Sequence, residues 1–228
     1  MADGAVSEQS VLQILALRID PVWRRLGAEE RAVDRDAFAR AIRQTGAVTT
    51  LVYSTVGLRA DADLVLVRTA AALDDLEENA ARLLRSGMGR FASASHAFTG
   101  LIRSSRYVKK PGAQEQALIS GERARYLIVY PFTKTTEWYL LGREARQGMM
   151  NEHIRIGHDF PQVRQLLAYS TGLDDQEFIV AYETDDLPAF QDLVTALRET
   201  DARPYTLRDQ PILTAIYRPL DEALDLLG

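Results

Sequence analysis

The chain repeats itself at a spacing of about half its length, and this repeat constrains its fold more than any other feature of the sequence. Residues 23–27, WRRLG, match residues 138–142, WYLLG, at a spacing of 115 residues. Residues 53–58, YSTVGL, match residues 169–173, YSTGL, with one residue fewer. Self-similarity of this kind predicts two copies of one structural unit.

The expected helices and strands follow the same order in both copies. The first copy has expected strands at 11–19, 51–58, 64–69 and 91–102 and helices at 22–43 and 73–84. The second has expected strands at 125–132, 163–170, 177–183 and 211–218 and helices at 137–156 and 186–199. The order β-α-β-β-α-β is that of a ferredoxin-like unit, an antiparallel sheet with helices on one face. We therefore predict an α+β protein with two ferredoxin-like halves in tandem.

The predicted halves are residues 1–102 and 124–228, joined by residues 103–123. Pro111-Gly112 in the connecting segment is typical of a solvated linker. The alternative is a flap that carries Lys109, Lys110 or Gln116 over the rim of a pocket. The acidic end, residues 221–228, has no assignable role.

Composition excludes several kinds of chemistry. The chain has no cysteine, so disulfides and thiolate-bound metals are excluded, and its three histidines are too few for a multi-histidine metal cluster. The net charge of −5 argues against nucleic acid or an anionic membrane as the main partner. No apolar run approaches the length of a membrane span, and the N-terminus is polar, so we expect a cytoplasmic protein.

The two copies differ at three matched positions. Apolar residues of the first copy are replaced by polar ones in the second: Ile19 by Lys134, Phe38 by His153, and Val48 by Arg164. His153 shares a helix face with Met149, Met150 and Ile156. Such a histidine is usually a core residue, but neutral imidazole is also a common ligand of metals and of haem iron. Because cations appear at both other positions, the pattern favours a ligand, in the second half only.

The neighbouring polar residues allow two interpretations each. Lys134, at a strand end, is either an exposed lysine or a partner for a cofactor carboxylate. Trp138 is expected in the core, where it could also form a wall of the cofactor site. Arg164 is expected to share a strand face with Leu166 and Ala168. Its side chain either extends to solvent at the sheet edge or binds an anionic ligand. Glu183 and Asp209 are candidate carboxylate partners for His153, and each is otherwise a surface acid.

Four segments together resemble the chlorite dismutase family over essentially the whole chain. They are YPFTK at 130–134, EWY at 137–139, MMNEH at 149–153 and GLDDQEF at 172–178. The resemblance implies one haem b in the second half, with His153 as the proximal ligand of its iron. It also implies that Lys134 and Trp138 line the propionate side and that Arg164 is the distal residue. We expect Met149 and Ile156, on the face of His153, to contact the cofactor as well.

The family contains at least two chemistries. Chlorite dismutases split chlorite into chloride and dioxygen with a distal arginine. The related coproheme decarboxylases oxidise the propionates of coproheme with peroxide, and use a tyrosine at the position of Tyr130, usually with glutamine in place of the arginine. This chain has Tyr130 and Arg164, but Gln165 stands beside Arg164, which leaves the register open by one residue.

The sharing of a strand face with apolar residues favours Arg164 over Gln165 as the distal residue. The resemblance then implies chlorite decomposition, with Arg164 and Tyr130 as the catalytic residues. The alternatives are a coproheme decarboxylase and a non-enzymatic haem-binding protein of the same fold. The resemblance further implies a small anionic substrate, chlorite or peroxide. It also implies a homo-oligomer, with a pentamer expected and a dimer as the second choice.

Overall fold

A computed structural model describes residues 10–44, 46–103 and 121–228. Contacts divide the chain into two compact units. The first contains the residues up to Ile102 together with Ala215–Gly228, and the second contains Arg103–Thr214. The proposed flap residues Lys109, Lys110 and Gln116 lie outside the described residues.

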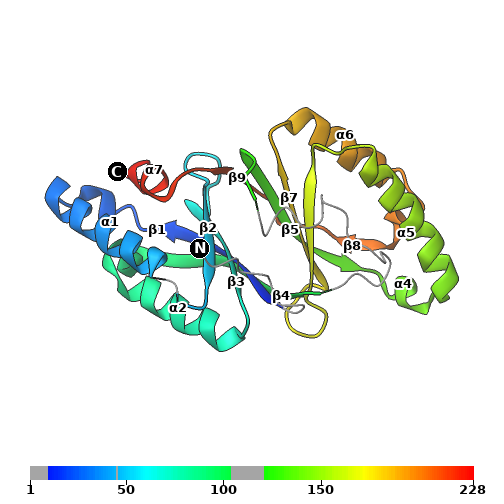
Figure 1. Ribbon diagram of the computed structural model, residues 1–228, viewed down its shortest axis with the longest axis horizontal. Coiled ribbons are helices and arrows are strands. Elements are labelled where there is room, and N and C mark those ends of the chain that lie inside the picture. The colour runs from blue at the N-terminus through cyan, green and yellow to red at the C-terminus, as the bar shows by residue number, and fades with distance from the viewer. Residues whose placement is uncertain (1–9, 45, 104–120) are drawn as a thin grey trace. The chain divides into compact units, whose positions relative to one another are not determined.

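The first unit is a ferredoxin-like sheet with two helices on one face (Figure 1). Its elements are β1 (Ser10–Ile19), α1 (Ala28–Arg43), β2 (Thr49–Ser54), β3 (Leu64–Ala70), α2 (Leu73–Arg85) and β4 (Ala92–Ile102). The strands lie in the order β4-β1-β3-β2, and their pairings are antiparallel. Under the helices lies an apolar core that includes Leu15, Leu17, Phe38 and Leu66, all buried.

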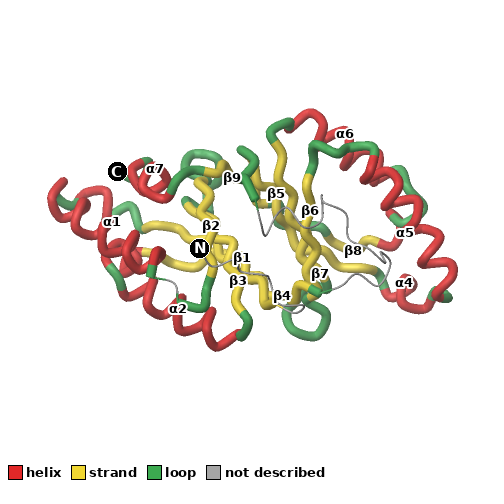
Figure 2. The backbone as a smooth tube through the Cα atoms, viewed as in Figure 1, coloured by secondary structure: helices red, strands yellow, loops and turns green. Residues whose placement is uncertain are grey.

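The second unit repeats this arrangement (Figure 2). Its elements are β5 (Tyr126–Lys134), α4 (Thr136–Leu140), α5 (Arg143–His158), β6 (Arg164–Tyr169), β7 (Phe178–Thr184), α6 (Leu187–Arg198) and β8 (Thr206–Arg208). The strand order β6-β7-β5-β8 is the same as in the first unit, and the pairings are again antiparallel. Two ferredoxin-like halves, as predicted from the repeat, are therefore confirmed.

Both long helices start later than predicted, at the same point of the repeat. The expected helix 22–43 is a 3₁₀ turn, Trp23–Arg25, followed by α1. The expected helix 137–156 is α4 followed by α5. Gly27 and Gly142 precede α1 and α5, with φ/ψ of −58°/150° and −59°/152°. These extended residues break each helix, and α5 runs on to His158, two residues past the expected end.

The C-terminal end differs from the prediction. The strand expected at 211–218 is β9 (Leu213–Tyr217), which pairs with β2 of the first unit at Tyr53 and Ser54. It is followed by α7 (Leu220–Asp225), and Ala223, Leu224 and Leu227 are buried in the core of the first unit. The acidic end therefore has a structural role, and the second unit stops at Thr214 rather than at the C-terminus. β9 also borders β5, as expected for the last strand of the second half, and the short strand β8 pairs with β5 at Thr133 and Lys134.

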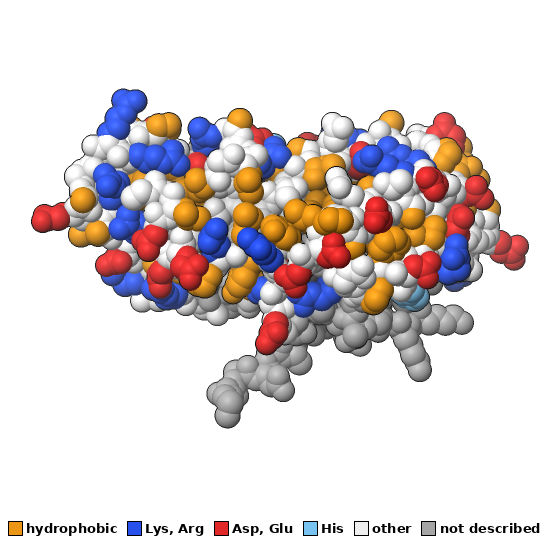
Figure 3. All heavy atoms as spheres, turned by 90° about the horizontal axis from the view of Figure 1, so that it is seen from above, with side chains coloured by type: hydrophobic (Ala, Val, Ile, Leu, Met, Phe, Trp, Pro, Cys, Tyr) orange, Lys and Arg blue, Asp and Glu red, His pale blue; other side chains and the backbone are white. Residues whose placement is uncertain are grey.

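The helices and the surface add two further observations. None of the helices in the described ranges is long and apolar enough to cross a membrane. On the face shown in Figure 3, acidic, basic and apolar side chains are interspersed. No charge of one sign dominates that face.

Candidate functional site

Side chains from β5, β7, α5 and α6 meet on one face of the second sheet, called here the helix face. It is defined by a cluster in which Val163, Tyr182 and Leu193 are buried, with Tyr130 and Ile156 packed against them. Phe160, Val180, Phe190 and Leu197 complete this cluster. Because strand residues alternate between faces, membership of this cluster identifies which residues of each strand point toward the helices.

His153 lies on α5, half-buried, with an imidazole that is held neutral. Its Nδ1 atom is buried and has no hydrogen-bond partner in the described part of the chain. Burial, and to a smaller extent the nearby charge of Lys134, lower the pKa of His153 to about 4. A neutral imidazole keeps a lone pair available, which is what a metal ligand requires.

Lys134 is a buried cation beside the aromatic wall of the site. The residue is 8% exposed, and its Nζ atom lies 4.2 Å from the ring centroid of Trp138 and 5.0 Å from that of Phe132. Nζ donates to the carbonyl of Ala202 at 3.4 Å. Burial lowers the pKa of Lys134 to about 8, and the carboxylate of Glu177 opposes this shift. A cation in this setting suits an anionic group brought by a ligand.

Trp138 occupies the position expected from the repeat. It is 3% exposed, and its ring lies 5.8 Å from that of Tyr205. Lys134 contacts the Trp138 ring, and its charge acts on the His153 imidazole. These three predicted site residues therefore lie near one another. Met149 and Ile156 are half-buried on the same helix, and Ile156 packs in the helix-face cluster with Tyr130.

Tyr130 points to the helix face from β5. Its ring centroid lies 6.0 Å from that of Tyr182, and the two side chains are hydrogen-bonded. Burial raises the pKa of Tyr130. Asp209 acts in the same direction, while Arg198 and Arg203 act against it. The sequence offered no signal for Tyr182, Arg198 or Arg203, because nothing in a strand or helix pattern shows which distant residues will meet.

Arg164 lies on the opposite face of the sheet. It pairs across the β6–β7 ladder with Glu183, and its Nη2 atom lies 3.1 Å from the Glu183 carboxylate, which is fully buried. Its Nη1 atom donates to the carbonyl of Glu122 at 2.7 Å. The sharing of a face with Leu166 and Ala168 was predicted correctly, but that face is turned away from His153. The structure therefore does not support Arg164 as a residue above the cofactor.

Gln165 takes the position that had been expected for Arg164. It pairs across the ladder with Tyr182, which belongs to the helix-face cluster. Val163, two residues earlier, is buried in that cluster too. Since residues two apart in a strand share a face, Gln165 points to the helix face. The register left open by the sequence thus favours glutamine over arginine.

The two candidate carboxylate partners of His153 have other partners. Glu183 is held by Arg164 and by Arg123, at 3.1 and 3.6 Å, on the opposite face. Asp209 lies 2.8 Å from Arg203 and 3.7 Å from Arg198. Neither carboxylate bonds to His153 within the described ranges.

These residues fit a large, planar, partly apolar cofactor with carboxylate groups. Along α5 no residue is fully buried, although Met149, Met150, His153 and Ile156 share one side of it. A buried imidazole nitrogen without a partner and a buried ammonium complete the set of groups. An iron porphyrin would use each of them: the imidazole as ligand, the apolar side chains as contacts and the cation for a propionate.

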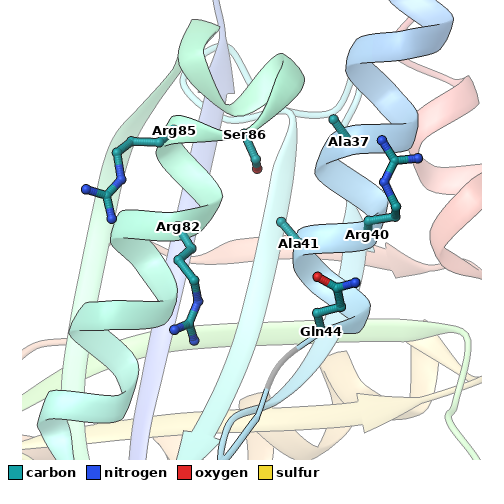
Figure 4. A pocket seen from close by; sticks show the side chains of 7 residues that line it. All are labelled: Ala37, Arg40, Ala41, Gln44, Arg82, Arg85 and Ser86. Carbon is teal, nitrogen blue, oxygen red and sulfur yellow. The ribbon is translucent and has the colours of Figure 1, made fainter.

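A hollow in the first unit is explained by the ends of two helices. Its volume is about 360 Å³, and it is open between α1 and α2 (Figure 4). It is lined by Ala37, Arg40, Ala41, Gln44, Arg82, Arg85 and Ser86. The arginines are exposed and stand in the last turns of their helices, where cations complement the helix dipole. Arg85 points away from α1 in Figure 4 and donates to its own helix at the Ala81 carbonyl.

Comparisons with known proteins identify the family of this chain. The chlorite dismutase family model matches residues 28–218. The coproheme decarboxylase of Mycolicibacterium smegmatis is 32% identical over 191 residues, which cover 82% of this chain and 81% of that protein. A mutant of the chlorite dismutase from Candidatus Nitrospira defluvii has a TM-score of 0.88 and 29% identity, covering 96% of this chain and 95% of its own. A structure described as a putative chlorite dismutase has a TM-score of 0.80 and 26% identity, covering 96% and 99%. The chain belongs to the chlorite dismutase family, whose members are haem enzymes.

Proposed function

We propose that this protein is a coproheme decarboxylase, which uses peroxide to remove propionate carboxylates from an iron porphyrin bound to His153. The observation that carries the proposal is the side-chain composition of the helix face. Tyr130 and Gln165 point to it, whereas Arg164 is held by Glu183 on the other face. The Mycolicibacterium smegmatis relative, named a coproheme decarboxylase, supports the same choice.

Each residue of the site would have a role that follows from the chemistry of its side chain. His153, neutral at physiological pH, would hold the iron, and the Lys134 ammonium would pair with a propionate. The bound iron porphyrin would supply the peroxide chemistry, in which one propionate and one peroxide, with a proton, give a vinyl group, carbon dioxide and two waters. Tyr130 would place its phenol beside the propionate that reacts.

The positions of Gln165 and Arg164 favour coproheme decarboxylation over chlorite decomposition. A neutral amide can hydrogen-bond a peroxide without holding an anion by charge. Chlorite decomposition is the second candidate, and the extensive match to chlorite dismutase structures favours it. It would need a cation on the helix face, and there Arg198 and Arg203 are already paired with Asp209.

The test supplies the purified chain with coproheme and peroxide, or with haem b and chlorite. We expect vinyl products by mass spectrometry in the first case and little dioxygen in the second. Tyr130→Phe should slow decarboxylation by about a hundred-fold or more, the usual size of a lost proton-transferring group. Arg164→Ala, provided that it folds, should keep decarboxylation. Dioxygen release from chlorite that depends on Arg164, without decarboxylation, would contradict the proposal.

A further inference from the structure

Tyr182 is a buried tyrosine that the proposed chemistry does not yet use. It is 4% exposed on β7, and its ring lies between those of Tyr130, at 6.0 Å, and Phe190 of α6, at 5.3 Å. In the β5–β7 ladder Tyr130 pairs with Val180 and Ile128 pairs with Tyr182. Tyr182 is therefore a diagonal neighbour of Tyr130 on the same face of the sheet.

The hydroxyl groups of Tyr130 and Tyr182 share a hydrogen bond in a buried setting. Burial is the largest influence on both, and it raises both pKa values. The hydrogen bond lowers the pKa of Tyr130 and raises that of Tyr182. A phenol hydroxyl can donate or accept, but once Tyr130 has lost its hydrogen its oxygen can only accept, so Tyr182 must then be the donor. In the arrangement with Tyr182 as donor, the hydrogen of Tyr130 is left for another acceptor.

The first unit shows that the sheet does not require a tyrosine at this point. Its matching cross-strand pair is Gln13 and Arg68, at the place of Ile128 and Tyr182. Arg68 is fully buried and bonds to Gln13, to Asn79 and to the Leu76 carbonyl, so it ties α2 to the sheet. Tyr182 instead bonds to a neighbouring side chain of its own sheet. The residue at this position of the fold therefore ties a helix to the sheet in the first half, whereas in the second half it bonds to Tyr130.

The other charged groups that act on Tyr130 form one cluster. Asp209 raises the pKa of Tyr130, whereas Arg198 of α6 and Arg203 lower it. Asp209 is bound by Arg203 at 2.8 Å and lies 3.7 Å from Arg198. The carboxylate and the two guanidinium groups thus act on Tyr130 in opposite directions. The hydroxyl of Tyr182 is the uncharged group that acts on the Tyr130 oxygen directly.

We infer that Tyr182 is a positioning residue for Tyr130. By donating to the Tyr130 oxygen it fixes the direction of the Tyr130 hydroxyl and stabilises that oxygen when its hydrogen leaves. The Tyr130 hydrogen is then presented to an acceptor within the site, and the carboxylate of a bound substrate is the acceptor of matching chemistry. This role rests on the proposed function, because it assigns Tyr130 to the reaction.

The test measures the ionisation of Tyr130 in the full-length chain without added haem. Isotope-labelled tyrosine is followed by NMR against pH, and the Tyr130 signal is assigned by its loss in Tyr130→Phe. In Tyr182→Phe we expect Tyr130 to ionise about one to two pH units higher, because a hydrogen bond to the charged form is lost. Tyr169→Phe is the matched control. It removes a hydroxyl from a buried tyrosine of β6, whose ring contacts Phe178, and should leave Tyr130 unchanged.

Turnover separates this inference from the proposed function. With coproheme and peroxide, Tyr182→Phe should slow decarboxylation several-fold at unchanged coproheme affinity. An unshifted Tyr130 ionisation, or an equal shift in Tyr169→Phe, would overturn the positioning role. Unchanged turnover in Tyr182→Phe would overturn it as well. If the wild type does not decarboxylate coproheme at all, the proposed function fails, while the NMR titration still decides whether Tyr182 controls Tyr130.

Discussion

Helices α1 and α5 occupy the same place in the two units and pack differently. Both have 16 residues, and both begin after a glycine of nearly identical backbone conformation. In α1, Asp34, Phe38, Ala39 and Ile42 are buried, whereas α5 has no buried residue. The repeat has therefore preserved the backbone of the helix but not the closed packing beneath it.

The residues around the matched tryptophans show how the packing was opened. In the first unit, Trp23 donates its indole N–H to the buried carboxylate of Asp34 at 3.2 Å, and Arg90 lies 2.9 Å from that carboxylate. In the second unit, Met149 stands at the position of Asp34, and Trp138 instead lies under the Lys134 ammonium. Among the residues that the structure describes, no carboxylate lies within salt-bridge distance of Lys134, so the second cluster suits an anionic ligand where the first is closed by its own ion pair.

The largest expected effect tests the closed packing of the first unit. Phe38→Ala should lower the free energy of unfolding by about 3–5 kcal/mol, because it leaves a cavity at a fully buried position. His153→Ala, at the matched position, should change it by less than about 1 kcal/mol when no haem is present, since this side chain is only half-buried. Chemical denaturation of the two variants measures both values. Equal destabilisation would mean that the two helices do not differ in packing.

The second effect concerns the cofactor. His153→Ala should weaken haem binding by about a hundred-fold or more, since even the loss of a partner of a metal ligand costs 10–100-fold. His158→Ala is the control, because that exposed residue at the end of α5 should keep its haem. Haem titration followed by the Soret band gives the affinity and the number of haems per chain. We expect one, and a value of two would show that the first unit binds haem as well.

The smallest effect is a dependence of stability on pH. The pKa of His153 is about 4 in the folded chain and near 6.5 when unfolded, so the unfolded chain binds the proton first as the pH falls. Stability without haem should therefore decline between about pH 6.5 and pH 4, by on the order of 2 kcal/mol. His153→Ala should remove this part of the decline. An unchanged pH profile in that variant would mean that the imidazole is not held neutral by its surroundings.

The repeat in the sequence predicted most of the fold, and it also pointed to His153 and Lys134 through their mismatch with Phe38 and Ile19. What it could not predict depended on contacts between distant segments. The alternation in β6 showed that Arg164 and Gln165 point in opposite directions, but which of them faces α5 depends on the pairing with β7. The partner of β9 and the burial of α7 are likewise set by residues of the first unit, far away in the chain. The roles of the site residues stay predictions.

The absence of buried residues along α5 has a consequence for how long the protein lasts before it is degraded. Segments with little buried apolar surface open locally at small free-energy cost, so their amide hydrogens exchange early and proteases cut them first. A cofactor that binds only the closed form would suppress this opening by mass action. Chains with bound cofactor would thus persist, whereas chains without cofactor would be degraded by proteases. Cofactor supply would then set the abundance of the protein as well as its activity.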